Sequence, residues 1–131
     1  MSENFEKVKA YLQDLELPIE SEDQAEELVV ITDDERGIHN LIIDCEAPIL
    51  ILEQAILPLP SNTEKLYERL LEINRTLVHG AFAIDLETRT VLFRDTLRLD
   101  TLDRSELEGS INALSLAMAE NAEELITFSK N

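Results

Sequence analysis

Residues 61–99, SNTEKLYERLLEINRTLVHGAFAIDLETRTVLFRDTLRL, hold a helix with two apolar stripes followed at once by a pair of strands. Ser61 and Glu64 have the spacing of a capping box, and Gly80 suits the left-handed position that ends many helices. We therefore predict a central helix from Ser61 to His79. Its first apolar stripe, at helical spacing, consists of Leu66, Leu70, Ile73 and Leu77.

A second apolar stripe lies beside the first on the same predicted helix. It consists of Tyr67, Leu71 and Val78, with Asn74 at the matching position. A helix that packs on one side only does not need both stripes. Burying a large apolar side chain stabilises a protein by about 1.5 to 3 kcal/mol, and this stabilisation is lost when the side chain stays in water. We predict that these four residues form a homodimer interface in which Asn74 fixes the register. The alternative is that another part of the same chain covers them.

The rest of the chain predicts an α+β fold. Ser2 can cap a first helix, which ends before Pro18 and whose apolar residues are Phe5, Val8, Leu12 and Leu15. Three strands follow, at Leu28–Ile31, Ile38–Cys45 and Ile49–Leu57. After the central helix come two strands within residues 81–99 and a last helix that begins near Asp103. The predicted order is helix, three strands, helix, two strands, helix, as one domain over residues 1–131 with an antiparallel sheet and helices packed on one face.

The third predicted strand is apolar on both faces. Ile49 and Ile51 point to one face, and Leu50 and Leu52 point to the other. In a small α+β domain such a strand needs helices on one side and another chain, or a bound segment, on the other. A β-bulge that leaves only one face dry is the alternative.

The charge of the chain excludes several classes of partner. Its 131 residues include 28 acids and 11 bases, which gives a formal net charge of −17. Tight binding to nucleic acid or to an anionic membrane is therefore not expected. The first 37 residues hold 12 of the acids and three of the bases, and this acidic run is either a solvated face or a docking site for a basic ligand. The longest apolar run, Ala47–Leu59, is too short to span a bilayer.

Few residues offer chemistry. Cys45 is the only cysteine, and the amino terminus lacks the pattern of a secretory signal, so we expect a cytoplasmic protein. Cys45 with His39 or His79 is the only conceivable thiol nucleophile arrangement, but Cys45 belongs to a dry strand face. The acids at 33–35 lack the alternating spacing of an EF-hand, and no nucleotide or zinc motif occurs. We expect no catalytic residues, no cofactor and no metal ligands.

Three segments, LYERLLEINRTLVHGAFAID, TVLFRDTLRLDTLD and SELEGSINALSLAMAENAEEL, carry a resemblance to a known family. Together with the element order they resemble the type III secretion chaperone-like superfamily, and more closely the bacterial YbjN-type proteins and those called molecular chaperone Tir. The resemblance implies a homodimer built around the central helix and the neighbouring strands. It also implies binding of an unfolded partner segment along the outer sheet surface and the first helix, and it carries over no catalytic residues.

The expected function is therefore a non-catalytic, homodimeric chaperone-like or adaptor module that binds a protein partner by strand addition or in apolar grooves. The candidate partner-binding residues are Phe5, Val8, Leu12, Leu50 and Leu52. The alternative is a regulatory or structural dimer that binds a folded partner and has no chaperone activity.

Overall fold

A computed structural model describes residues 2–130. The helices are α1 (Glu3–Asp14), α2 (Glu64–Asn74) and α3 (Arg104–Ser129), and a 3-10 turn covers Asp34–Arg36. The strands are β1 (Ile19–Asp23), β2 (Leu28–Asp33), β3 (Ile38–Glu46), β4 (Ile49–Pro58), β5 (Ala81–Asp85) and β6 (Thr90–Arg98). The predicted caps of the first and last helices are confirmed, since Ser2 Oγ accepts from the Phe5 N–H at 3.2 Å and Asp103 Oδ1 accepts from the Glu106 N–H at 2.7 Å.

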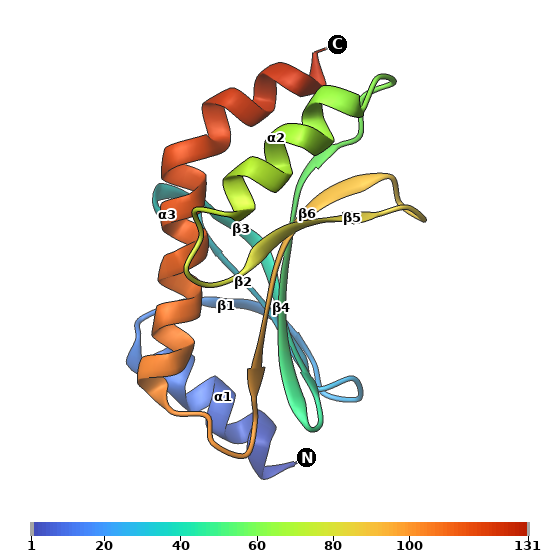
Figure 1. Ribbon diagram of the computed structural model, residues 1–131. Helices are drawn as coiled ribbons and strands as arrows, with labels where there is room; N and C mark the ends of the chain where they lie inside the picture. The colour runs from blue at the N-terminus through green and yellow to red at the C-terminus, as the bar shows by residue number, and fades with distance from the viewer. Residues whose placement is uncertain (1, 131) are drawn as a thin grey trace.

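The strands form one six-stranded sheet in the order β1-β2-β3-β4-β6-β5, and every neighbouring pair is antiparallel. The chain crosses from β4 through α2 to the far edge, so β5 becomes the edge strand and β6 returns beside β4. All three helices lie on one face of the sheet, and α3 runs the length of that face between α1 and α2 (Figure 1). The predicted α+β class, with an antiparallel sheet and helices on one face, is confirmed.

The hydrophobic core lies between the helices and the face of the sheet that they cover, which we call the inner face. Alternate residues of the strands point into it and are almost fully buried, among them Val29, Ile31, Leu41, Ile43, Leu50, Leu52, Val91 and Phe93. The helices contribute one apolar stripe each: Phe5, Val8 and Leu12 from α1; Leu66, Leu70 and Ile73 from α2; and Leu107, Ile111 and Leu114 from α3. On the opposite face of the sheet, the outer face, no helix lies within residues 2–130 (Figure 1).

The sheet has one strand more than predicted. No strand was predicted before Leu28, but residues 20–23, three of which are acidic, belong to β1, which pairs antiparallel with β2. The sequence of β1, IESED, lacks alternating apolar residues, because the strand lies at the sheet edge with its acids exposed. Backbone pairing with β2 rather than burial holds this strand, and inward apolar periodicity does not detect it.

The central helix is shorter than predicted at both ends. It begins at Glu64, with Thr63 as an N-cap that makes no side-chain hydrogen bond, and it ends at Asn74 instead of His79. At that end the Asn74 side chain binds the edge strand β5: Phe82 N–H donates to Asn74 Oδ1 at 2.7 Å, and Asn74 Nδ2 donates to the Phe82 carbonyl at 3.0 Å. Val78 therefore lies in the connection to β5 and not on the helix.

Gly80 allows this connection to enter β5. Its φ of +74° lies in the left-handed region, where a side chain is strained. A Cβ atom at this position would also lie 2.5 Å from Cζ of Phe93, which packs edge-on against Phe82 with ring centroids 5.4 Å apart.

We predict that Gly80→Ala lowers the free energy of unfolding by about 2 to 4 kcal/mol, because it combines backbone strain with a steric overlap in the core. Gly109→Ala is the matched control. A Cβ there meets nothing within 4 Å, and alanine in the middle of α3 should raise stability by about 0.5 to 1 kcal/mol. Urea denaturation followed by circular dichroism measures both, and equal effects of the two substitutions would contradict the prediction.

Candidate functional site

The outer face of the sheet presents aliphatic side chains without a covering layer. One row of directly paired residues crosses four strands and consists of Val30, Ile42, Glu53 and Arg94. The next row consists of Leu28, Asp44, Ile51 and Thr96. Ile42, near the centre, is 41% exposed, whereas its sequence neighbours Leu41 and Ile43 on the inner face are at most 2% exposed. The outer face thus presents a cluster of aliphatic side chains, next to charged and polar ones, that is open to a partner.

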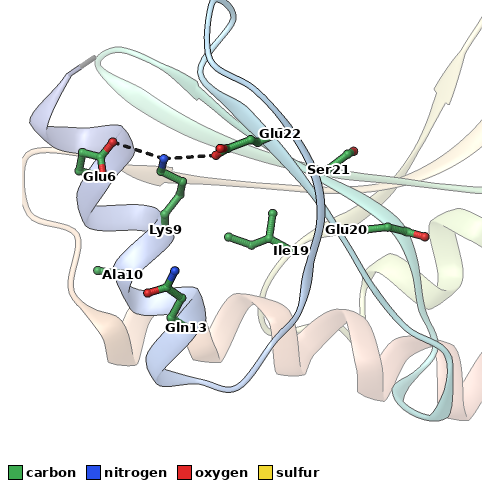
Figure 2. Close-up of a pocket in the computed structure, with 8 residues that line it drawn as sticks. All are labelled: Glu6, Lys9, Ala10, Gln13, Ile19, Glu20, Ser21 and Glu22. Carbon is green, nitrogen blue, oxygen red and sulfur yellow. Dashed lines mark ion pairs between the residues drawn. The ribbon is translucent and has the colours of Figure 1, made fainter.

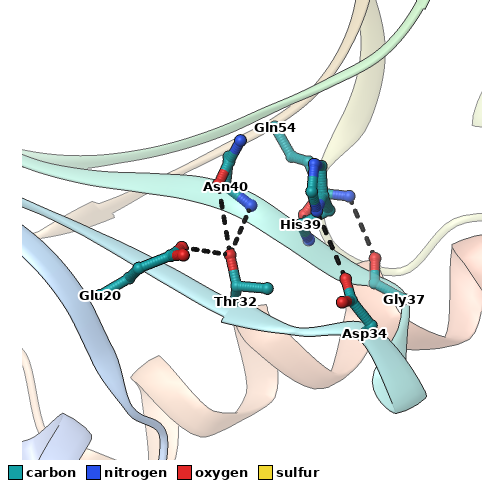
Figure 3. Close-up of polar contacts among 7 residues, drawn as sticks. All are labelled: Glu20, Thr32, Asp34, Gly37, His39, Asn40 and Gln54. Atoms are coloured by element: carbon teal, nitrogen blue, oxygen red, sulfur yellow. Dashed lines mark hydrogen bonds and ion pairs between the residues drawn. The ribbon is translucent and has the colours of Figure 1, made fainter.

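Polar contacts bound this surface at one end and one side. At the end near the β2–β3 turn, Thr32 Oγ1 donates to Glu20 Oε2 at 2.8 Å and accepts from the Asn40 N–H at 3.0 Å (Figure 3). Toward β6, Glu53 and Arg94 form an ion pair at 3.5 Å. These charged and hydroxyl groups already have hydrogen-bond or ion-pair partners. The largest gain in free energy from covering the outer face would therefore come from burying its central aliphatic side chains.

Asp44 lies within the aliphatic part of the outer face. Its Oδ1 atom is inaccessible to solvent and has no hydrogen-bond partner among the residues that the structure describes. Burial of the carboxyl raises its pKa to about 6, and the charge of Glu46, a side-chain hydrogen bond with Glu46, and the charges of Glu26 and Glu53 raise it further. Asp44 is therefore a carboxylate at neutral pH whose charge is poorly compensated within its own chain.

The residues predicted to contact a partner are not on this face. Phe5, Val8, Leu12, Leu50 and Leu52 are at most 3% exposed, because α1 packs its apolar stripe on the inner face and Leu50 and Leu52 point toward it. The assignment of these five residues to a partner surface is wrong for the folded chain. The predicted two-faced character of β4 is correct, but Ile51 and not Leu50 or Leu52 carries the open side.

Sequence reasoning did not select Val30, Ile42 or Asp44 as partner contacts. The alternation along β3 places Leu41, Ile43 and Cys45 on a dry face and Asp44 on the opposite, wet face, as the structure has it. Which residues of β2 and β4 lie beside Asp44 on that face depends on strand register, which exists only in the paired sheet.

The four residues predicted at a dimer interface differ in their exposure and in the contacts that they make. Leu71 and Val78 are 72% and 88% exposed, and Tyr67 is partly buried. Val78 lines a hollow of about 170 Å³ together with Leu116 of α3, which is 60% exposed. Both groups of the Asn74 amide bind the Phe82 backbone within the chain.

A groove of about 480 Å³ separates α1 from β1 (Figure 2). Lys9 extends into it from α1 and forms ion pairs with Glu6 at 3.3 Å and with Glu22 of β1 at 3.2 Å. Lys9 Nζ also lies 4.6 Å from the centre of the Phe5 ring. The polar groups of this groove thus serve to attach the edge strand to α1.

The buried amide of Gln54 holds the turn between β2 and β3. It accepts from the His39 N–H at 2.9 Å and donates to the Gly37 carbonyl at 3.0 Å (Figure 3). Asp34, one of the acids considered for calcium, instead lies 3.3 Å from His39 Nδ1. Within residues 2–130 no group of histidine, cysteine, aspartate or glutamate side chains is arranged to hold a metal ion.

Cys45 is not placed for nucleophilic catalysis. It lies six residues from His39 along β3, about 20 Å at 3.3 Å per residue, and β4 and β6 separate it from the segment that carries His79. Burial raises the pKa of the Cys45 thiol to about 11, and the charges of Glu27, Asp44 and Glu46 add to the rise. The thiol stays protonated at neutral pH and is a poor nucleophile.

None of the helices described for this chain is long and apolar enough to cross a lipid bilayer.

We predict that Asp44→Asn stabilises the protein at pH 7.5 and has little effect at pH 4. The folded-state pKa of Asp44 is raised, so wild-type stability falls as pH rises from about 4 to 6, and the variant lacks this fall. The expected gain is about 1 kcal/mol or less, because solvent screens a partly exposed group. Urea unfolding at both pH values measures it, with Glu87→Gln on the β5–β6 turn as a charge-matched control. A gain of equal size at both pH values would contradict the assignment.

The family model CesT_Tir_1 matches residues 1–131. A chain of the HopA1–SchA chaperone–effector complex is similar in structure, with a TM-score of 0.68 and 14% identity over 91% of this chain and 94% of that one. YbjN from E. coli also has a TM-score of 0.68 and 14% identity, over 92% of both chains. A chain of the ExoU–SpcU complex from the type III secretion system of Pseudomonas aeruginosa has a TM-score of 0.66 and 16% identity, over 94% and 98%. No curated protein matches.

Proposed function

The chain belongs to the CesT_Tir_1 family, and from that membership we propose that it is a cytoplasmic, non-catalytic chaperone-like module that works as a homodimer and holds an extended segment of a client protein. The observation that carries the proposal is the outer face: an aliphatic sheet surface, centred on Ile42, with all the helices on the other side. The similar structures include chaperones in complexes with effector proteins, which supports a protein as the partner.

An extended segment suits this surface better than a small molecule does. The outer face is broad and carries aliphatic side chains on β2, β3 and β4, and within residues 2–130 the larger hollows are open and lined by charged or polar groups as much as by apolar ones. Small-molecule sites are typically enclosed and mostly apolar. A segment in strand conformation points every second side chain at the surface below it, and thus matches the aliphatic rows of β2, β3 and β4.

The second part of the proposal is a homodimer through α2 and the connection that follows it. Leu71 and Val78 are the most exposed large apolar side chains described in the chain, and Leu116 of α3 adjoins Val78 in the same hollow. α2 and α3 lie on the helix side of the sheet (Figure 1), so a contact through these helices leaves the outer face free in a dimer. Burying all three in a symmetric contact would gain several kcal/mol per subunit, at about 1.5 to 3 kcal/mol for each side chain.

We predict that Leu71→Asp converts the dimer to a species of half the mass, because a charge at this position would be buried without a partner. Light scattering coupled to size-exclusion chromatography measures the mass. Leu86→Asp is the matched control, since Leu86 is 70% exposed on the β5–β6 turn and should leave the mass unchanged. An unchanged mass for Leu71→Asp would remove α2 from the interface.

We predict that Ile42→Asp weakens the binding of unstructured peptides at least tenfold and leaves the fold intact, since Ile42 is exposed at the centre of the outer face. An array of random 12-residue peptides probed with labelled protein measures the binding. Ile126→Asp is the matched control, because Ile126 is 52% exposed on α3 and should not change it. If the wild-type protein binds no peptide and associates only with folded proteins, the regulatory or structural dimer becomes the better description.

A further inference from the structure

Asp44 occupies a position on the outer face that the rest of the chain leaves incomplete. Its direct cross-strand neighbours are Leu28 on β2 and Ile51 on β4, and Ile42 precedes it by two residues on the same face of β3. Directly paired residues in antiparallel strands have Cβ atoms about 4.5 to 5.5 Å apart, so aliphatic groups flank the carboxylate on three sides. A partner covering these aliphatic side chains would also cover the carboxylate.

One oxygen of this carboxylate lacks a hydrogen-bond donor among the described residues. Oδ1 of Asp44 makes no hydrogen bond within residues 2–130 although solvent does not reach it. A buried acceptor left unpaired destabilises a protein, and a covering layer without a donor would increase that cost. Whatever binds the outer face at this point must therefore bring a hydrogen-bond donor.

The charges around Asp44 indicate that the donor is a cation. Glu26, Glu46 and Glu53 all act on this carboxyl with the same sign of charge. The arginines of β6, which lies beyond β4, are engaged elsewhere, since Arg94 pairs with Glu53 at 3.5 Å and Arg98 with Asp100 at 2.9 Å. A metal ion is not favoured, because the described carboxylates form no group arranged to hold one. A lysine or arginine side chain fits both the charge and the need for a donor.

This inference rests on the proposed function and specifies the class of client. We propose that the outer face selects extended segments in which a lysine or arginine lies two residues from an aliphatic residue on each side, and that its basic group binds Asp44 Oδ1. Spacing of two follows from the strand conformation, which directs alternate side chains to the same face. The aliphatic residues then cover Leu28 and Ile51, which flank Asp44 on the two neighbouring strands, while the basic residue neutralises the carboxylate between them.

The test uses the same array of random 12-residue peptides with the wild-type chain, Asp44→Asn and Glu87→Gln. Wild-type protein should select peptides with the aliphatic-x-basic-x-aliphatic pattern. Replacing the basic residue of a selected peptide by glutamine should weaken its binding to wild-type protein about tenfold and to Asp44→Asn less than threefold. Glu87→Gln controls for the general attraction of basic peptides to an acidic protein, and it should keep the wild-type preference at 150 mM salt, a concentration at which the Debye length is about 8 Å.

The outcomes separate the inference from the proposed function. Selection of aliphatic peptides without a basic residue, or an unchanged basic preference in Asp44→Asn, would overturn the inference and leave peptide binding on the outer face in place. Equal loss of the preference in Asp44→Asn and Glu87→Gln would also overturn it, because the preference would then reflect net charge alone. Absence of binding to any peptide by the wild-type protein would reject the proposed function and the inference together.

Discussion

The alternation of side chains along β4 is the constraint on which the rest of the structure depends. In this central strand Leu50 and Leu52 enter the core while Ile49 and Ile51 point away from it, so both faces of the sheet are apolar at the same place. The helices can cover only one of these faces. A chain built in this way keeps a cohesive core under α1, α2 and α3, and presents an aliphatic surface on the other side of the same strand.

The edges of the sheet show how the chain limits that exposure. At one edge the acids of β1 are exposed, and Lys9 attaches the strand to α1 through Glu22. At the other edge Asn74 hydrogen-bonds both backbone groups of Phe82. The exposed charges of β1 at one edge and the Asn74 amide on β5 at the other disfavour pairing with strands of other chains. Binding through the side chains of the outer face is therefore favoured over binding at the sheet edges.

The acidity of the chain has a local consequence as well as a general one. A net charge of −17 disfavours anionic partners everywhere on the surface. Around Asp44 and Cys45, carboxylates combine with burial to raise the pKa of both side chains. Burial is the largest cause of both shifts, and the negative charges of nearby carboxylates add to each of them. Binding, and not bond-making chemistry, is what these residues are suited to.

Short-range patterns in the chain predicted the three helices, five of the six strands and the caps at Ser2 and Asp103. These features are visible in the sequence because periodicity and capping depend on residues within one or two turns of each other. They also showed that β4 is apolar on both sides and that Leu71 and Val78 exceed the needs of one core. They could not find β1 or the early end of α2 at Asn74, and they did not show that Asp44, on the wet face of β3, lies beside Leu28 and Ile51. Each of these depends on a backbone partner elsewhere in the chain, and strand register, which decides which side chains of neighbouring strands lie side by side, exists only once the sheet has formed.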